Sequence, residues 1–272
     1  MAAIDSTLPR TLGCDHTGRA APIAMLPALV LAAGLGTRIR AISGGLPKPM
    51  VPFRGTPILV HNLRWLASGG VRKVWINLHF APDAIRDAIG DGSDFGLSVE
   101  YLYEPILLGT AGAFGTLGAH LPGPALVVYG DNLLKLDLTA LLATHRAARA
   151  DATVALFDRA RHAHTGIAGS RVQCAEDGRV TAFVEGSASA SAAGPELVNT
   201  GVYVVEARVR DLIPAGRLVD FGREVFPTML ERGDRVQGHV IEEAGFCLGL
   251  DTPESHVAGN ALLDANRIRL AS

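Results

Sequence analysis

The segment that most constrains this chain is the glycine-rich stretch at residues 31–38, which reads LAAGLGTR and follows an apolar run. Its glycines allow backbone N–H groups to converge on phosphate oxygens, because glycine adopts conformations that other residues avoid. Arg38 adds a planar fork of charge-assisted hydrogen-bond donors. The stretch lacks the third glycine of GxGxxG and the GK[ST] ending of ATPase loops. An ordinary strand-to-loop turn would explain the glycines but not Arg38, so the sequence predicts a phosphate-binding turn.

From residue 28 onward, short runs of Val, Ile and Leu alternate with helical patterns. This alternation is typical of βα units and predicts an α/β fold with a mainly parallel, mixed sheet. In the first half we expect strands at 28–31, 74–77, 98–102, 125–129 and 153–157, and helices near 57–68, 82–89, 111–117 and 138–150. In the second half we expect strands at 170–174, 180–185, 199–204, 236–241 and 246–250, and a last helix over 253–270.

The same patterns indicate how the chain is organised. Residues 1–24 have no periodic apolar face, and we interpret them as a poorly ordered N-terminal arm. Residues 25–272 are expected to form a single domain. The βα alternation ends near Asp158, where shorter strand candidates begin, and this second part is expected to complete the sheet.

Composition and charge exclude several classes of protein. The chain has 48% hydrophobic and 19% charged residues, as folded globular proteins do. Its formal net charge is -2, so no overall basic field attracts nucleic acid or an anionic membrane. The apolar stretch at 20–34 is interrupted by prolines and is too short to span a bilayer. The three cysteines lack disulfide or zinc-ligand spacing, which favours a cytoplasmic location.

A second candidate phosphate ligand follows ten residues after the glycine-rich stretch. Lys48 lies between two prolines in the sequence LPKPMVP. The prolines fix the backbone and limit the directions that the lysine side chain can take. A PKP sequence alone is more often a surface turn. When it follows a phosphate-binding turn in the sequence, it predicts a lysine whose ammonium group is held rigidly toward a phosphate.

A candidate metal ligand, Asp131, directly follows the apolar strand expected at 125–129. The carboxyl ends of parallel strands form the ligand crevice of an open α/β sheet. A carboxylate at that edge is suited to hold Mg²⁺ against phosphate oxygens. The alternative is an aspartate that caps a turn or helix, which is common at such positions.

Together these segments resemble the sugar-1-phosphate nucleotidylyltransferase superfamily, which includes mannose-1-phosphate and heptose-1-phosphate guanylyltransferases and N-acetylmuramate-1-phosphate uridylyltransferase. The resemblance extends from about Leu26 to Ile268 and rests on LAAGxGTR followed by PKP. Further matching segments are Glu104-Pro105, 108–112 (LGTAG), 130–132 (GDN), 199–201 (NTG) with Tyr203, 220–223 (DFGR) and 251–254 (DTPE).

The resemblance implies a three-layer, Rossmann-like nucleotide-diphospho-sugar transferase fold, with a nucleotide-binding half at 25–158 and a sugar-phosphate-binding half at 159–272. It implies attack of a sugar 1-phosphate on the α-phosphorus of an NTP, assisted by Mg²⁺, to give an NDP-sugar and pyrophosphate. The LGTAGA form of the loop at 108–113 favours GTP, with UTP next. The resemblance also leaves room for a homo-oligomer.

The resemblance assigns roles to particular residues. Arg38, Lys48 and Asp131 are the expected catalytic residues, and Asp131 and Asp251 the expected metal ligands. The expected nucleotide-binding residues are Leu31, Ala32, Ala33, Gly34, Gly36, Thr37, Gly109, Thr110 and Asn132. The expected sugar-phosphate-binding residues are Glu185, Asn199, Thr200 and Gly201.

Two positions depart from the family's pattern. Gly186 stands where most relatives carry a lysine that binds the sugar phosphate, and Arg161, Arg179 and Arg223 are candidate replacements. Gly249 and Asp251 are exchanged relative to the usual order, so Asp251 either reaches the metal or only caps the following helix.

These departures keep two alternatives open. One is a catalytically impaired regulatory protein that binds sugar nucleotides, and the other is a glycosyltransferase of related fold. A regulatory protein that only binds sugar nucleotides would not require the cations Arg38 and Lys48. The second would use a DxD metal motif, which the DNL sequence at 131–133 does not supply.

Overall fold

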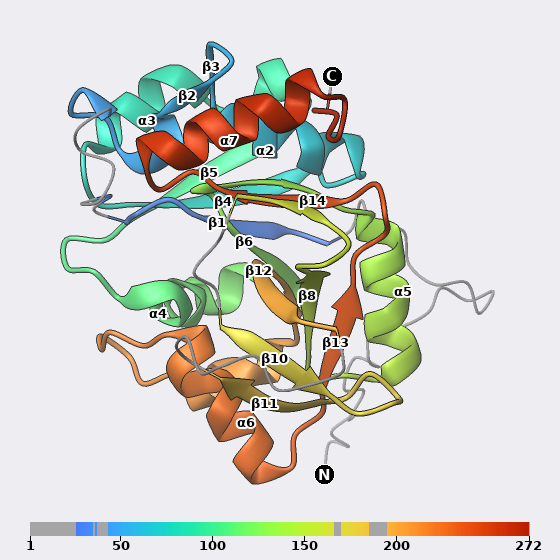
Figure 1. The fold of residues 1–272 in the computed structure, drawn as a ribbon. Coiled ribbons are helices and arrows are strands. Elements are labelled where there is room, and N and C mark those ends of the chain that lie inside the picture. The colour runs from blue at the N-terminus through green and yellow to red at the C-terminus, as the bar shows by residue number, and fades with distance from the viewer. Residues whose placement is uncertain (1–25, 35, 37–42, 166–169, 185–194, 272) are drawn as a thin grey trace, which may run out of the picture.

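The computed structural model describes residues 26–34, 36, 43–165, 170–184 and 195–271, so the arm expected at 1–24 lies outside them. Its centre is a nine-stranded sheet in which the order β11-β10-β12-β6-β1-β4-β5 is extended by β8 and β13 beside β12 (Figure 1). The strands are β1 (Ala28–Leu31), β4 (Lys73–Leu78), β5 (Ser98–Tyr103), β6 (Ala125–Tyr129), β8 (Ala152–Asp158), β10 (Arg171–Cys174), β11 (Val180–Val184), β12 (Leu197–Val205) and β13 (Val236–Val240).

One part of this sheet is parallel, and the other part contains antiparallel as well as parallel pairs. Strands β6, β1, β4 and β5 are parallel neighbours. Strand β12 is antiparallel to both β6 and β8, whereas β13 is parallel to β8. The predicted α/β class with a mainly parallel, mixed sheet is therefore confirmed, and the strands of the second half of the chain complete the sheet.

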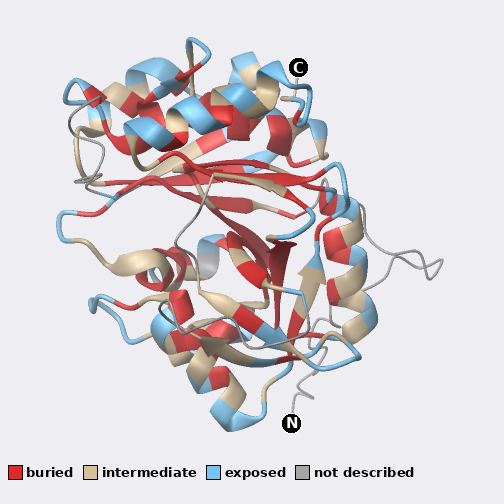
Figure 2. Ribbon diagram, viewed as in Figure 1, coloured by how far each residue is buried: buried red, intermediate tan, exposed pale blue. Residues whose placement is uncertain are grey.

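Helices cover both faces of the sheet and produce three layers. The α-helices are α2 (Ile58–Ser68), α3 (Pro82–Ile89), α4 (Gly109–Leu117), α5 (Leu138–Ala148), α6 (Phe226–Arg232) and α7 (Pro253–Asp264). Alternate residues of β1 belong to opposite cores, because side chains of a strand point to opposite faces. Val30 packs with residues of α2, α3 and α5, and Leu29 with residues of α4 and α6. Figure 2 shows buried residues concentrated in the strands and on the inner sides of the helices.

A smaller sheet was not expected from the sequence. It has the order β7-β14-β9 and consists of β7 (Asn132–Lys135), β14 (Phe246–Gly249) and β9 (Ala163–His164). Strand β7 begins directly after Asp131, in a stretch where the sequence predicts no strand. Antiparallel pairing places Gly249 opposite Asn132, so the residues that follow β14 lie beside the residues that precede β7.

The last helix is shorter than expected. The sequence predicted it over 253–270, but α7 ends at Asp264. Asn266 has a positive φ of 53°, a conformation that ends helices, and the Arg267 N–H donates to the Leu262 carbonyl. The chain then turns back and buries Ile268 in the apolar cluster beneath α7. The burial of Ile268 therefore takes precedence over the helical pattern of residues 265–270.

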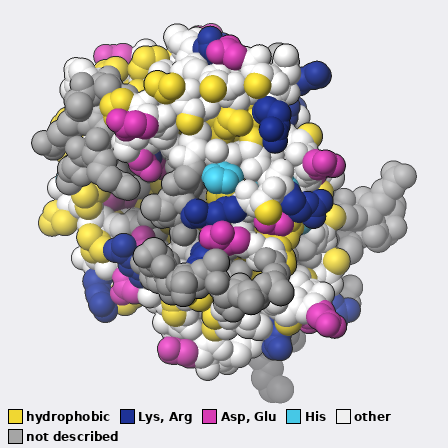
Figure 3. Space-filling view, viewed as in Figure 1, with side chains coloured by type: hydrophobic (Ala, Val, Ile, Leu, Met, Phe, Trp, Pro, Cys, Tyr) yellow, Lys and Arg dark blue, Asp and Glu magenta, His cyan; other side chains and the backbone are white. Residues whose placement is uncertain are grey.

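The surface agrees with the near-neutral charge of the sequence. Figure 3 shows acidic and basic side chains on the same face, with no extended area of one sign among the described residues. Within the described part of the chain, no helix combines the length and the apolar character needed to cross a membrane.

Candidate active site

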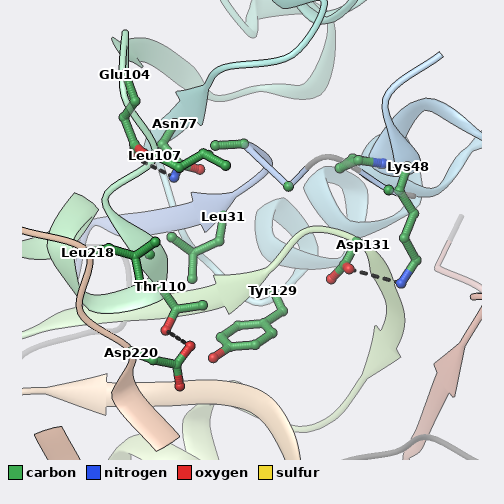
Figure 4. Close-up of a pocket in the computed structure, with 15 residues that line it drawn as sticks. Leu31, Lys48, Asn77, Glu104, Leu107, Thr110, Tyr129, Asp131, Leu218 and Asp220 are labelled. Atoms are coloured by element: carbon green, nitrogen blue, oxygen red, sulfur yellow. Dashed lines mark hydrogen bonds and ion pairs between the residues drawn. The ribbon is translucent and has the colours of Figure 1, made fainter. Parts of the chain in front are cut away.

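A cavity of about 280 Å³ opens where the parallel strands β1, β4 and β6 end (Figure 4). Ligand sites of open α/β sheets lie at this edge, because the loops that follow the strands diverge there. The described residues that line the cavity are Leu31, Ala33, Gly34, Gly36, Lys48, Pro49, Asn77, Glu104, Leu107, Gly109, Thr110, Tyr129, Asp131, Leu218 and Asp220.

The glycine-rich turn forms one wall of this cavity. Leu31 ends β1, and Ala33, Gly34 and Gly36 continue the lining beyond it. Gly36 has a positive φ of 54°, which explains why the turn needs glycine there. The predicted contributors Thr37 and Arg38 lie outside the described residues, so their roles stay predictions.

Lys48 lies at the start of a short 3-10 helix, η3 (Lys48–Met50), and its side chain is almost fully buried. Its Nζ lies 2.9 Å from Oδ2 of Asp131 and 2.5 Å from Oδ1 of Asp251. Burial disfavours the charged ammonium group, but the attraction of the two carboxylates outweighs burial and raises the pKa of Lys48. The lysine is therefore charged throughout the physiological pH range.

Asp251 reaches the site, and the alternative that it only caps α7 is wrong. The N-cap of α7 is Thr252, which forms a capping box with Ser255. The Asp251 carboxylate is instead directed at Lys48, although the two residues are 203 positions apart in the chain. The pairing of β14 with β7 brings Asp251 to Lys48, because it places the end of β14 beside Asp131.

Asp131 and Asp251 thus face a common point and could hold one divalent cation between them and bound phosphates. Mg²⁺ in proteins commonly takes one or two carboxylates, and phosphates and water complete its shell. Among the described residues, no group of three or more His, Cys, Asp or Glu side chains is placed to hold a metal.

A buried polar bridge that was not predicted as part of the site connects the glycine-rich turn to the loop before α4. Asn77 Oδ1 accepts from the Ala32 N–H at 2.6 Å, and Asn77 Nδ2 donates to Oε1 of Glu104 at 2.8 Å. Oε2 of Glu104 accepts from the Leu108 N–H at 3.1 Å. No local pattern in the sequence indicates Asn77, because its partners come from other strands and loops.

The first residues of α4 are fixed from the other side by the segment around Asp220. The Thr110 hydroxyl donates to Asp220 Oδ2 at 2.8 Å and accepts from the Phe221 N–H at 2.9 Å. Gly109 has φ 76°, and a Cβ there would come within 2.4 Å of the Val219 carbonyl oxygen. Glycine at 109 therefore permits this close packing. Gly109 and Thr110 line the cavity, and their role in nucleotide binding stays a prediction.

The predicted sugar-binding residues Asn199, Thr200 and Gly201 form an irregularity in β12, where its register with β8 shifts. Asn199 Oδ1 accepts from the Gly201 N–H at 2.8 Å, and Nδ2 donates to the Tyr203 hydroxyl at 2.8 Å. Thr200 is fully buried and its hydroxyl donates to the Ala155 carbonyl, so its side chain cannot contact a sugar. None of the three is among the described residues that line the cavity.

Gly201 acts on the site through Tyr129. It has φ 80°, and a Cβ would lie 2.7 Å from the Tyr129 ring. The close contact at this glycine is therefore with an aromatic side chain of the protein. Burial, then the neighbouring Tyr203 and Asp220, raise the pKa of Tyr129, so its phenol stays protonated beneath the cavity.

Other predicted positions lie elsewhere. Asn132 is largely buried and donates from Nδ2 to the Thr200 carbonyl at 3.4 Å, so it is not part of the lining. Glu185 and Gly186 lie outside the described residues. Arg161, Arg179 and Arg223, the candidate replacements for the missing lysine, are not among the described residues that line the cavity.

The fold and the site define a class of protein, namely three-layer α/β proteins with a cavity at the ends of parallel strands, where a glycine-rich turn, a buried lysine and its two aspartate partners come together. More specifically, the chain belongs to the nucleotidyl transferase family, which matches residues 27–245.

Curated relatives support this assignment. The mannose-1-phosphate guanylyltransferase of Mycobacterium tuberculosis is 37% identical over 236 residues, which cover 86% of this chain and 63% of that protein. The UTP–glucose-1-phosphate uridylyltransferase of Synechocystis sp. is 31% identical over 220 residues, which cover 76% of this chain and 56% of that protein. The chain thus spans less than two thirds of the length of these two relatives.

Solved structures support the fold. The structure of HddC from Yersinia pseudotuberculosis superposes with a TM-score of 0.72 at 22% identity and covers 87% of this chain and all of that one. The complex of the same protein with GMP-PN gives a TM-score of 0.70 over 86% of this chain and 97% of that chain. At this identity the likeness establishes the shared architecture alone.

Proposed function

We propose that this chain is a sugar-1-phosphate nucleotidylyltransferase, which transfers a nucleoside monophosphate from an NTP to a sugar 1-phosphate and releases pyrophosphate. The observation that carries the proposal is the buried Lys48 ammonium between Asp131 and Asp251, opposite the glycine-rich turn. A protein that only bound a sugar nucleotide would not need a buried cation at the phosphate end of the cavity. Family membership and the names of the two curated relatives support the same reaction.

In this proposal Asp131 and Asp251 hold Mg²⁺, which would neutralise negative charge on the NTP phosphates. The chain's own groups position the reactants. The N–H groups of the glycine-rich turn, together with Arg38, bind the phosphates that leave as pyrophosphate, and Lys48 stabilises charge at the α-phosphate. Because both substrates are anionic, holding them in line and neutralising charge supplies most of the catalysis.

We further propose that GTP is the preferred nucleotide, with UTP second, and that the protein acts in the cytoplasm. The LGTAGA loop supports the nucleotide preference, and Gly109 and Thr110 of this loop line the cavity. The two named relatives are a guanylyltransferase and a uridylyltransferase, consistent with these two bases as the leading candidates.

The test is a panel of pyrophosphate-release assays that crosses four NTPs with the 1-phosphates of mannose, heptose, glucose and N-acetylmuramate. The proposal predicts Mg²⁺-dependent release with at least one pair, and the fastest release with GTP. Nucleotide binding without release from any pair would instead support the regulatory alternative. Glycosyl transfer from an NDP-sugar, without pyrophosphate release, would support the glycosyltransferase alternative.

A further inference from the structure

Lys48 is the only basic side chain among the described residues that line the cavity. Its Nζ donates to Oδ2 of Asp131 and to Oδ1 of Asp251, so a single ammonium group bridges the two carboxylates. Figure 4 shows this ammonium turned toward Asp131. The proposed reaction needs the same group at the α-phosphate, so one cation has two roles that compete with each other.

The ammonium also competes with a divalent metal for the same oxygens. Nζ lies 2.5 Å from Oδ1 of Asp251 and 2.9 Å from Oδ2 of Asp131. Mg²⁺ binds its oxygen ligands at about 2.0–2.1 Å, so a metal on these two oxygens would be a close neighbour of the ammonium. Two cations this close repel each other, because a buried group has little water around it to screen the charge. Metal binding to both carboxylates is therefore favoured only when the ammonium moves away.

The balance of charge indicates what moves it. One ammonium and two carboxylates together carry one net negative charge, which opposes an incoming triphosphate. When the ammonium turns to the phosphates, the carboxylates lose their partner, and partly buried carboxylates without a partner are unfavourable. A divalent cation shared by the carboxylates and the phosphates would remove both problems. Metal and phosphate therefore favour each other's binding, whereas metal alone has to displace the ammonium.

The side chain of Lys48 has the freedom that this exchange requires. Pro47 and Pro49 fix the backbone on either side, and Lys48 is the first residue of the buried η3. Lysine carries its ammonium on a flexible four-carbon stem, which can redirect the charge by rotation about its outer bonds. Because the side chain borders the cavity, this rotation needs no movement of β7 or β14.

We propose that the Lys48 ammonium occupies the cation position of Asp131 and Asp251 until an NTP binds, so that a divalent metal enters the site together with the nucleotide and only weakly without it. The inference rests on the proposed function, because it takes the two aspartates to be the metal ligands. It adds a second role to Lys48, which keeps the carboxylates neutralised before it acts on the phosphates.

The test measures Mn²⁺ binding by electron paramagnetic resonance, which detects the metal that stays free in solution, without nucleotide or sugar phosphate. Lys48→Met removes the competing charge and should bind Mn²⁺ about 10-fold or more tightly than the wild type. Adding Asp251→Asn to this variant should abolish the gain, because the gain depends on both carboxylates. Equal Mn²⁺ affinity of the wild type and a folded Lys48→Met protein would overturn the inference.

Lys73→Met is the matched control. It also releases a carboxylate from an ion pair, but the Lys73–Glu100 pair is half-exposed and lies outside the described cavity lining. This variant should bind Mn²⁺ no more tightly than the wild type, and a gain as large as that of Lys48→Met would contradict the inference. Mg²⁺ should also raise the Tm of Lys48→Met but not that of the wild type, because a ligand that binds only the folded state stabilises it.

The wild type provides a second test if Lys48→Met fails to fold. Water-proton relaxation increases when Mn²⁺ is bound to a protein, and it can be measured for the wild type and for Asp251→Asn. With Mn²⁺ alone the two proteins should behave alike, and with GTP added the wild type should bind the metal more tightly. If Asp251→Asn lowers Mn²⁺ affinity already without nucleotide, the metal reaches the carboxylates despite the ammonium and the inference is refuted.

The inference and the proposed function can fail separately. If Lys48→Met gains Mn²⁺ affinity but the wild type releases no pyrophosphate with any substrate pair, the proposed reaction fails and the inference stands. If the wild type releases pyrophosphate and Lys48→Met leaves Mn²⁺ binding unchanged, the inference alone fails.

Discussion

Replacing Lys48 by methionine is the most direct test of the proposed site, because it removes the charge and keeps much of the apolar volume. Removing one partner of a fully buried ion pair typically costs 3–5 kcal/mol, since it leaves a buried charge without its partner. Here the Asp131 and Asp251 side chains are 37% and 23% exposed, so water can solvate them after the substitution. We therefore expect a loss of about 2 kcal/mol in the free energy of unfolding, or roughly 4–8 °C in Tm for a chain of this size.

The effect of Lys48→Met on turnover should be much larger than its effect on stability. Losing one preorganised contact to developing charge typically costs about 10²-fold to 10³-fold in kcat. Pyrophosphate release with the best substrate pair would measure it, and thermal unfolding would show that the protein remains folded. Lys73→Met is a matched control, because the Lys73–Glu100 pair is half-exposed and should contribute at most about 1 kcal/mol.

The pH dependence follows from the raised pKa of Lys48. A group whose pKa is raised by folding contributes stability below its unfolded pKa and loses that contribution as the pH rises through the folded value. The difference in Tm between wild type and Lys48→Met should therefore be constant near neutral pH and shrink only above about pH 10. Turnover of Lys48→Met within a few-fold of wild type would refute the catalytic role, whatever the stability.

Three further substitutions test other parts of the site. Asp251→Asn should raise the Mg²⁺ concentration needed for half-maximal turnover and lower kcat; unchanged metal dependence in a titration would leave Asp131 as the only carboxylate ligand. Gly201→Ala should destabilise the protein by about 1–3 kcal/mol in denaturant unfolding, because the new Cβ is strained and meets the Tyr129 ring. A neutral result would mean that β12 adjusts freely. Thr110→Val removes the hydroxyl that binds Asp220, and should raise KM for the NTP several-fold while costing about 1 kcal/mol in stability. A lower kcat with unchanged KM would contradict this positioning role.

The parts of the site that could be predicted from the sequence are those determined within a few residues. The turn at 31–36 and Lys48 follow from glycine and proline, whose backbone preferences hold in any context. Asp131 follows from its place after an apolar strand, because parallel strands end at a common edge. The structure places all three of these elements around one cavity.

The parts that could not be predicted depend on contacts between distant segments. The approach of Asp251 to Lys48 required the pairing of β14 with β7. A strand is expected at 246–250, but no local pattern indicates β7 or its pairing with β14. Asn77 has partners from β1 and from the end of β5, and no local pattern indicates such a bridge. The resemblance assigns Asn199 and Thr200 to the sugar phosphate, but the irregularity in β12 uses their amide and hydroxyl groups internally.

The pairing of β14 with β7 has a consequence for how the protein matures. Lys48 and Asp251 are separated by 203 positions, so the last of the charged groups at the phosphate end arrives only when the C-terminal region docks. Contacts of such long sequence separation form slowly, because the intervening chain must first be ordered. The βα units around β1, β4 and β6 contain mostly nearer neighbours and can fold earlier, including during synthesis from the N-terminus. Until β14 pairs, a partly folded chain would carry the glycine-rich turn and Lys48 without the second aspartate, and so could bind phosphates before it could act on them.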